Sequence, residues 1–237
     1  MTCSRQFWIS HAVWPAAVFL AAFTAIAFFD VDRRLAHAWF YDAARHQWLG
    51  AGEGAWWARD LLHTHGRWLI RIAFLAALVV WIAGFRSKKY RRPAAYAVLA
   101  MALSTTLVGG LKAVTNVDCP WNLQGFGGDR PYLPILASRP DALPHAKCFP
   151  GAHSSSGFAL MFGYFLFRGS SPRRARLALA GGACVGLLFA FGQEARGAHF
   201  ISHDLASAFI VWITLVWLSR AMLGQQERRD EHGPGVS

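Results

Sequence analysis

Long apolar runs alternate with short polar segments along the whole chain of 237 residues. Six of the runs are apolar enough, and close enough to the roughly 20 residues a bilayer requires, to be transmembrane helices. They cover residues 12–29, 68–85, 94–111, 152–167, 177–191 and 205–223. The pattern predicts an all-α, polytopic membrane protein built as a six-helix transmembrane bundle.

The overall composition changes this picture little. Hydrophobic residues make up 54% of the chain and charged residues 16%, which is too apolar for an ordinary soluble domain. The net charge of +11 would also suit a nucleic-acid-binding protein. The basic residues, however, lie mostly in short loops between the apolar runs, so we expect no nucleic-acid partner.

The basic residues favour one orientation in the membrane. Residues 86–92 contain five basic residues and residues 168–176 contain four, and neither segment contains an acid. Loops of this kind usually stay in the cytoplasm. We therefore predict a multi-pass protein of a bacterial-type inner membrane, with both termini cytoplasmic and anionic lipids as partners of these loops. The alternating topology makes the loops after the first, third and fifth spans extracytoplasmic.

The segment between the first two spans, residues 30–67, is rich in tryptophan, histidine and charge, and it is interpreted as an interfacial or amphipathic segment. His63 and His65 could bind a metal ion, but the spacing fits a solvated loop better, and no metal site is expected. In the fifth span, Gly182 and Gly186 have the spacing of a close helix–helix contact.

Three polar clusters fall on the extracytoplasmic side of this topology. They are Lys112 at the end of the third span, residues 148–156 at the start of the fourth, and residues 196–204 before the sixth. Ionisable groups beside a membrane span are costly, so they often serve a function. A polar cap at the headgroups is the simpler alternative. The convergence of three clusters on one face favours a functional site.

The residue types in these clusters suit a phosphate group. Lys112 and Arg196 would supply positive charge, and Gly151 and Ser154 lie where a helix start presents backbone N–H groups to an anion. Histidines can attack phosphorus or protonate a leaving oxygen. On a continuous helix, Arg196, His199 and His203 would share one face.

The spacing within the clusters also carries information. The segments read Lys112-x6-Cys119-Pro120, Pro150-Gly151-Ala152-His153 and Gly192-Gln193-x5-His199-x3-His203-Asp204. They resemble the patterns Lys-x6-Arg-Pro, Pro-Ser-Gly-His and Ser-Arg-x5-His-x3-Asp of the type 2 phosphatidic acid phosphatase / vanadium haloperoxidase superfamily. The resemblance extends from about the third span to the sixth.

Several positions depart from that pattern. Cys119 and Gln193 stand where the family has arginine, and Gly151 stands where it has serine. His203 stands at the position of the family's aspartate, and Asp204 follows it. The lysine and the two histidines of the pattern are retained, whereas both arginines are displaced. Misplaced arginines would weaken stabilisation of the transition state, so an inactive relative is one alternative.

The resemblance implies a role for each residue. His199 would attack phosphorus and form a phospho-histidine, while His153 would protonate the leaving oxygen and then activate water. Lys112 and Arg196 would hold the phosphate, with Arg130 as a second arginine from the preceding loop. No cofactor is implied, and phosphate binding needs no metal.

The partner that orients His199 stays open at this stage. Helical geometry favours His203, because Asp204 is turned away on a regular helix. Charge favours Asp204, because a carboxylate better stabilises an imidazolium.

The expected function is hydrolysis of a lipid phosphate or pyrophosphate at the extracytoplasmic, periplasmic face. The alternatives are a lipid-to-lipid phosphotransferase and a non-enzymatic transporter or assembly protein that binds anionic lipid headgroups. The sequence leaves the lipid and the oligomeric state open. We divide the chain into an N-terminal pair of spans, residues 1–93, a phosphatase-like core, residues 94–224, and a polar cytoplasmic tail, residues 225–237.

Two cysteines lie in the same extracytoplasmic loop. Cys119 follows Lys112, and Cys148 precedes the segment 150–153. Thiols in a periplasm tend to be oxidised, so we predict a disulfide, with two unpaired cysteines as the alternative. A bridge closing a loop of about 30 residues would contribute roughly 3–4 kcal/mol in the chain-entropy account.

Overall fold

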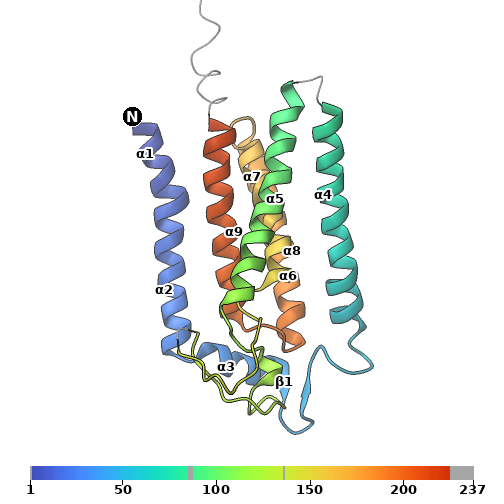
Figure 1. The fold of residues 1–237 in the computed structure, drawn as a ribbon. Coiled ribbons are helices and arrows are strands. Elements are labelled where there is room, and N and C mark those ends of the chain that lie inside the picture. Colours follow the sequence, from blue (N-terminus) through green and yellow to red (C-terminus); the bar gives the residue numbers. More distant parts are fainter. Residues whose placement is uncertain (1, 85–87, 136, 225–237) are drawn as a thin grey trace, which may run out of the picture.

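The computed structural model describes residues 2–84, 88–135 and 137–224, which are mostly helical (Figure 1). The predicted polar tail, residues 225–237, lies outside the described residues. The helices are α1 (Thr2–Trp8), η1 (Ile9–Val13), α2 (Trp14–Phe28), α3 (Val31–Leu35), η2 (Ala36–Phe40), η3 (Trp57–His65), α4 (Gly66–Ala83), α5 (Lys88–Val114), η5 (Pro120–Asn122), α6 (Ala152–Phe158), η6 (Ala159–Met161), α7 (Phe162–Phe167), α8 (Pro172–Ala195) and α9 (Ile201–Met222). Two short strands, β1 (Tyr41–Asp42) and β2 (Gln47–Trp48), pair antiparallel.

Five helical stretches are long and apolar enough to cross a membrane, so the structure confirms a mostly helical fold with several candidate membrane spans. They are Arg5–Phe28, Trp57–Ala83, Tyr90–Val114, Pro172–Ala195 and Ile201–Met222. The second stretch begins eleven residues before the predicted start of its span, because η3 continues directly into α4. The remaining predicted span, residues 152–167, consists of the three short helices α6, η6 and α7. The count of six spans therefore stays a prediction.

The helices run back and forth between two ends of the bundle (Figure 1). The start of α1 and the end of α9 lie at the upper end in this view. The ends of α2, α5 and α8 lie at the lower end, together with the starts of α4 and α9. The end of α5 and the start of α9 carry two of the polar clusters, which the fold thus brings to the same end of the molecule.

The bundle has an inner and an outer set of helices. In the inner set, half of the apolar stretch of Tyr90–Val114 is buried, and so is a third of the apolar stretch of Ile201–Met222. In the outer set, no part of the apolar stretch of Arg5–Phe28 is buried. The second stretch, Trp57–Ala83, is also almost fully exposed, at 6% buried. Such extensive apolar exposure suits contact with lipid chains.

Helices α6 and α8 approach each other at glycines. A Cβ atom on Gly157 would lie 2.8 Å from Gly186 Cα, and Gly186 itself faces the ring of Phe158. Gly182 faces the backbone of Leu160 and Met161. The close helix contact predicted from the Gly182–Gly186 spacing is confirmed, and it fixes the position of α6.

The segment between the first two spans folds over the lower end of the bundle. Its hairpin and η2 contribute Phe40, Tyr41 and Trp48 to a buried cluster that also contains Phe126 and Phe200. The Gly50 N–H donates to the Ala195 carbonyl at 2.7 Å. This part of the interfacial segment therefore supports the loop between α8 and α9.

Candidate active site

The polar cluster before the last helix is a turn. Helix α8 ends at Ala195, and α9 begins only at Ile201. Between them, Gly197 has a φ of +71°, and the ring of Trp48 occupies the space where a side chain would project. Only glycine adopts this backbone without cost. The expected single helical face of Arg196, His199 and His203 is wrong, because the turn separates the first two residues from α9.

His199 is held by a carboxylate from the first turn of α9. Its Nδ1 lies 2.9 Å from Asp204 Oδ1, and the residues are only 4% and 3% exposed. Because a carboxylate accepts hydrogen bonds, Nδ1 carries the proton and Nε2 keeps its lone pair. That second nitrogen lies 3.5 Å from Lys112 Nζ, at the end of α5. The ring is thus oriented with its unprotonated nitrogen within hydrogen-bond distance of the Lys112 amine.

His203 faces a different environment. Its ring centroid is 6.0 Å from that of His199, and it packs edge-on against Phe149 and Phe200. Within the described ranges, no hydrogen bond joins His203 to His199. The structure therefore provides Asp204, the residue favoured by charge, as the hydrogen-bond partner of His199. The geometric preference for His203 assumed a regular helix through residue 199, which the turn interrupts.

The second histidine of the site lies in the first turn of α6. His153 Nε2 is 3.0 Å from the carbonyl oxygen of Leu62, and its ring stacks on Phe189 at 4.4 Å. A carbonyl can only accept, so Nε2 carries a proton. The ring of His63 lies 4.8 Å away. His153 is therefore oriented by η3, a contact that its sequence motif does not indicate.

Positive charge gathers around these histidines. Burial, together with the nearby guanidinium groups of Arg59 and Arg67, lowers the pKa of Arg196 from its ordinary value. Among the described residues, Lys112, Arg67 and Arg196 form no ion pair. Cations that lack an ion-pair partner in a partly buried site favour an anionic ligand.

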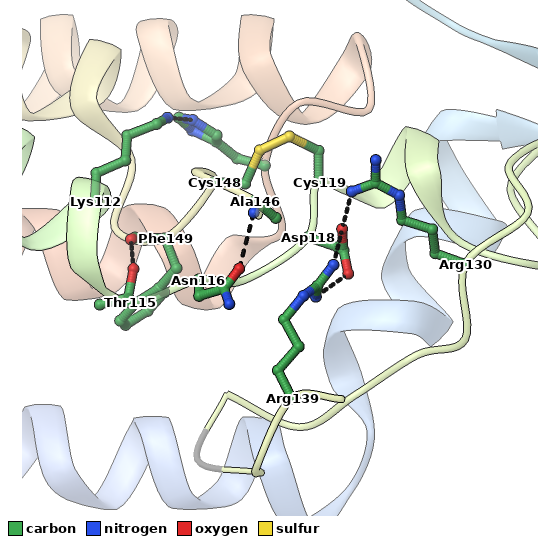
Figure 2. The surroundings of a disulfide bond; sticks show 11 residues. Lys112, Thr115, Asn116, Asp118, Cys119, Arg130, Arg139, Ala146, Cys148 and Phe149 are labelled. Carbon is green, nitrogen blue, oxygen red and sulfur yellow. Dashed lines mark hydrogen bonds and ion pairs between the residues drawn. A yellow bond between two sulfur atoms is a disulfide. The ribbon is translucent and has the colours of Figure 1, made fainter. Parts of the chain in front are cut away.

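Arg130 lies in a separate ion-pair cluster (Figure 2). Its Nη1 donates to Asp118 Oδ1 at 2.6 Å, and Arg139 binds both oxygens of the same carboxylate. The Arg130 side chain thus has a carboxylate partner in the loop. Its expected contact with phosphate stays a prediction.

Figure 2 also shows the disulfide between Cys119 and Cys148, the pair that we expected to be joined. Close to the bridge, the Cys148 N–H donates to the Val117 carbonyl at 3.0 Å, and Asn116 Oδ1 accepts from the Ala146 N–H at 2.8 Å. These contacts hold the chain after α5 beside the chain that leads into α6. Lys112 and His153 are thereby kept at one site.

Cys119 and Gln193, which stand where the family pattern has arginine, are both buried. Cys119 belongs to the disulfide, and Gln193 is 5% exposed near the end of α8. Gln193 Nε2 has no hydrogen-bond partner among the described residues. Arg196, one helical turn after Gln193, is the nearest arginine in the chain to this position.

One supporting residue carries no motif in the sequence. Asp32 on α3 is buried and accepts hydrogen bonds from Ser202 N at 3.0 Å and from Ser202 Oγ at 2.6 Å. Burial raises the pKa of this carboxyl group above its ordinary value, partly offset by those two bonds. Asp32 thus caps the start of α9, two residues before Asp204.

Two further findings concern ligands and relatives. The described ranges contain no group of three or more His, Cys, Asp or Glu side chains suited to holding a metal ion. No curated protein and no solved structure matches the chain. A family model described as the PAP2 superfamily matches residues 93–227, which is more than half of the chain. The chain therefore belongs to the PAP2 superfamily, whose members are phosphatases.

Proposed function

We propose that this protein is a membrane phosphatase that hydrolyses a lipid phosphate or pyrophosphate at the extracytoplasmic face, through a phospho-histidine at His199. The observation that carries the proposal is how the two ring nitrogens of His199 are held. Asp204 holds Nδ1, and the unprotonated Nε2 lies beside Lys112. A nucleophile oriented by a carboxylate, next to a cation, is suited to attack a phosphoryl group.

In the first step, His199 Nε2 forms a bond to phosphorus and the bond from phosphorus to the leaving oxygen breaks. The positive charge that develops on the imidazole is stabilised by Asp204. Lys112 and Arg196 stabilise the negative charge on the phosphoryl oxygens.

His153, in its doubly protonated imidazolium form, supplies the Nε2 proton for the leaving oxygen and becomes neutral. In the structure its Nε2–H is directed at the Leu62 carbonyl. A developing alkoxide is a stronger acceptor than a neutral carbonyl and competes for this proton. In the second step, water gives a proton to His153 and attacks the phospho-histidine, which releases phosphate and regenerates His199.

The lipid substrate is inferred from the surroundings of the site. The histidines lie at one end of a helical bundle whose outer helices expose large apolar residues, among them Leu20, Ile72 and Val79. A lipid headgroup at the membrane surface reaches such a position without leaving the bilayer. The basic loops after the second and fourth predicted spans support a cytoplasmic location for the opposite end.

Phosphate release by the purified protein in lipid–detergent micelles tests the proposal. The panel contains a diacylglycerol phosphate, a polyprenyl pyrophosphate and a phosphorylated glycolipid. We expect release from at least one of them, inhibition by vanadate, and no turnover by His199→Ala.

His153→Ala should retain measurable activity, with a loss of about 10²–10⁴-fold that is smallest for good leaving groups. His145→Ala is the control, because this histidine is exposed in a loop. Turnover by His199→Ala would refute the phospho-histidine mechanism. Phosphate transfer to a second lipid without release of inorganic phosphate would identify a phosphotransferase instead.

A further inference from the structure

The side chains of His199 and Asp204 fill the space beside Gly151. A Cβ atom at position 151 would lie 2.8 Å from His199 Nδ1 and would overlap Asp204 Oδ1. Real Cβ atoms essentially never come within 3.0 Å of another heavy atom. Any side chain at position 151 would therefore displace the carboxylate, the imidazole or the backbone.

The backbone at Gly151 has little freedom to withdraw. Its N–H donates to the His203 carbonyl at 3.1 Å, and its carbonyl accepts from Ser207 Oγ at 2.8 Å. Both partners are on α9, the helix that carries Asp204. The backbone of Gly151 is thus hydrogen-bonded to α9 close to Asp204, whose side chain occupies the space beside it.

Ser154 completes this arrangement. Its hydroxyl is fully buried and lies 2.5 Å from Asp204 Oδ1, the same oxygen that accepts from His199 Nδ1. The other carboxylate oxygen, Oδ2, has no hydrogen-bond partner among the described residues. The carboxylate is therefore oriented by its two bonds to Oδ1, one of which comes from Ser154, and by the neighbouring carboxyl group of Glu194 at the end of α8.

We propose that Gly151 and Ser154 are positioning residues for Asp204, and that together they allow the carboxylate to act from the fifth residue after His199. Gly151 provides the space and Ser154 provides the hydrogen bond. Two departures from the family pattern, glycine at 151 and aspartate at 204, are then one linked change. The effect on catalysis rests on the proposed role of His199, whereas the packing does not.

The first experiment measures catalysis. Ser154→Ala removes the hydroxyl, and Ser155→Ala is the matched control, because Ser155 is equally buried but donates to the Ala152 carbonyl. We expect Ser154→Ala to lower kcat by about tenfold or more with KM little changed, and Ser155→Ala to stay within about threefold of the unsubstituted protein.

The second experiment measures packing without turnover. Gly151→Ala is introduced into the unsubstituted protein, into Asp204→Ala and into Asp204→Asn, and the thermal unfolding midpoint is recorded in detergent. The added methyl group should lower the midpoint in the unsubstituted protein and in Asp204→Asn, which keeps the bulk of the side chain. It should lower the midpoint less in Asp204→Ala, which removes that bulk.

Equal midpoint shifts in the three backgrounds would overturn the proposal. So would equal values of kcat and KM for Ser154→Ala and Ser155→Ala. If the unsubstituted protein released no phosphate from any lipid, the proposed function would fail, and the unfolding midpoints alone would decide whether Gly151 makes room for Asp204.

Discussion

Each histidine of the site has one ring nitrogen held by an acceptor, and the acceptors differ. Asp204 carries a charge and holds His199 Nδ1, whereas the neutral Leu62 carbonyl holds His153 Nε2. A carboxylate stabilises a positively charged imidazole much more than a carbonyl does. The difference suits a nucleophile that becomes cationic in one case, and an acid that must release its proton in the other.

At the residue scale, the structure predicts that Asp204 matters more for turnover than His203. Asp204→Asn should lower kcat by at least about a hundredfold, because the amide no longer stabilises the imidazolium. His203→Gln serves as the comparison, since His203 is buried one residue away without a bond to His199. It should reduce stability, while the folded protein keeps a rate within about tenfold of the unsubstituted one. A larger rate loss in His203→Gln would show that His203 orients the nucleophile.

At the scale of the elements, the site depends on how closely α6 and α8 pack. Helix α6 carries His153 and Ser154, and α8 leads into the turn that carries His199. The two helices meet where Gly157 and Gly186 leave no room for side chains. Small residues at such contacts allow backbones to approach closely in a membrane, where hydrophobic driving force between helices is weak.

The helix contact can be tested with two glycines of α8. Gly186→Ala would place its methyl group against the ring of Phe158. We expect it to lower the free energy of unfolding by about 1–3 kcal/mol. Gly181→Ala is the control, because nothing lies within 4 Å of its added Cβ and alanine is the better helix former by about 1 kcal/mol. Unfolding midpoints in detergent should fall for the first variant and not for the second. Equal midpoints would show that α6 and α8 are not tightly packed at Gly186.

At the scale of the whole molecule, the N-terminal part is integrated into the site although the family model begins only at residue 93. Asp32 caps α9, Gly50 binds the end of α8, and the Leu62 carbonyl orients His153. The N-terminal residues therefore contribute contacts to the site, and the division of the chain at residue 93 stays a prediction. The family core alone would lack these three contacts.

The orientation of the molecule is a prediction at the same scale. In a background with Cys3 and Cys184 replaced by alanine, single cysteines are introduced as Asp141→Cys and Ser170→Cys, both at exposed positions. A membrane-impermeant maleimide applied to intact inner-membrane spheroplasts should label Asp141→Cys, in the loop near the active site. It should label Ser170→Cys, in the basic loop, only after the membrane is opened. The reverse pattern would place the active site in the cytoplasm.

Local composition and spacing along the chain were sufficient to predict the class of fold and the kind of site. Apolar runs predicted a helical membrane protein, because a helix that crosses a lipid bilayer needs a long apolar run in its own sequence. The spacing of Lys112, His153 and His199 predicted a phosphatase-type site, because the family pattern keeps these positions. The prediction that Cys119 pairs with Cys148 needed only their shared loop and compartment, and the structure contains that disulfide.

The contacts between side chains became known only from the folded arrangement. Asp204 contacts His199 only because Gly197 turns the chain before α9, and a helical projection cannot represent that turn. Arg130 pairs with Asp118, and Ser154 is directed at Asp204 although its position suggested a phosphate donor. These contacts depend on how separate segments approach in space, to within a few tenths of an ångström at Gly151. Neighbouring residues along the chain do not encode that approach.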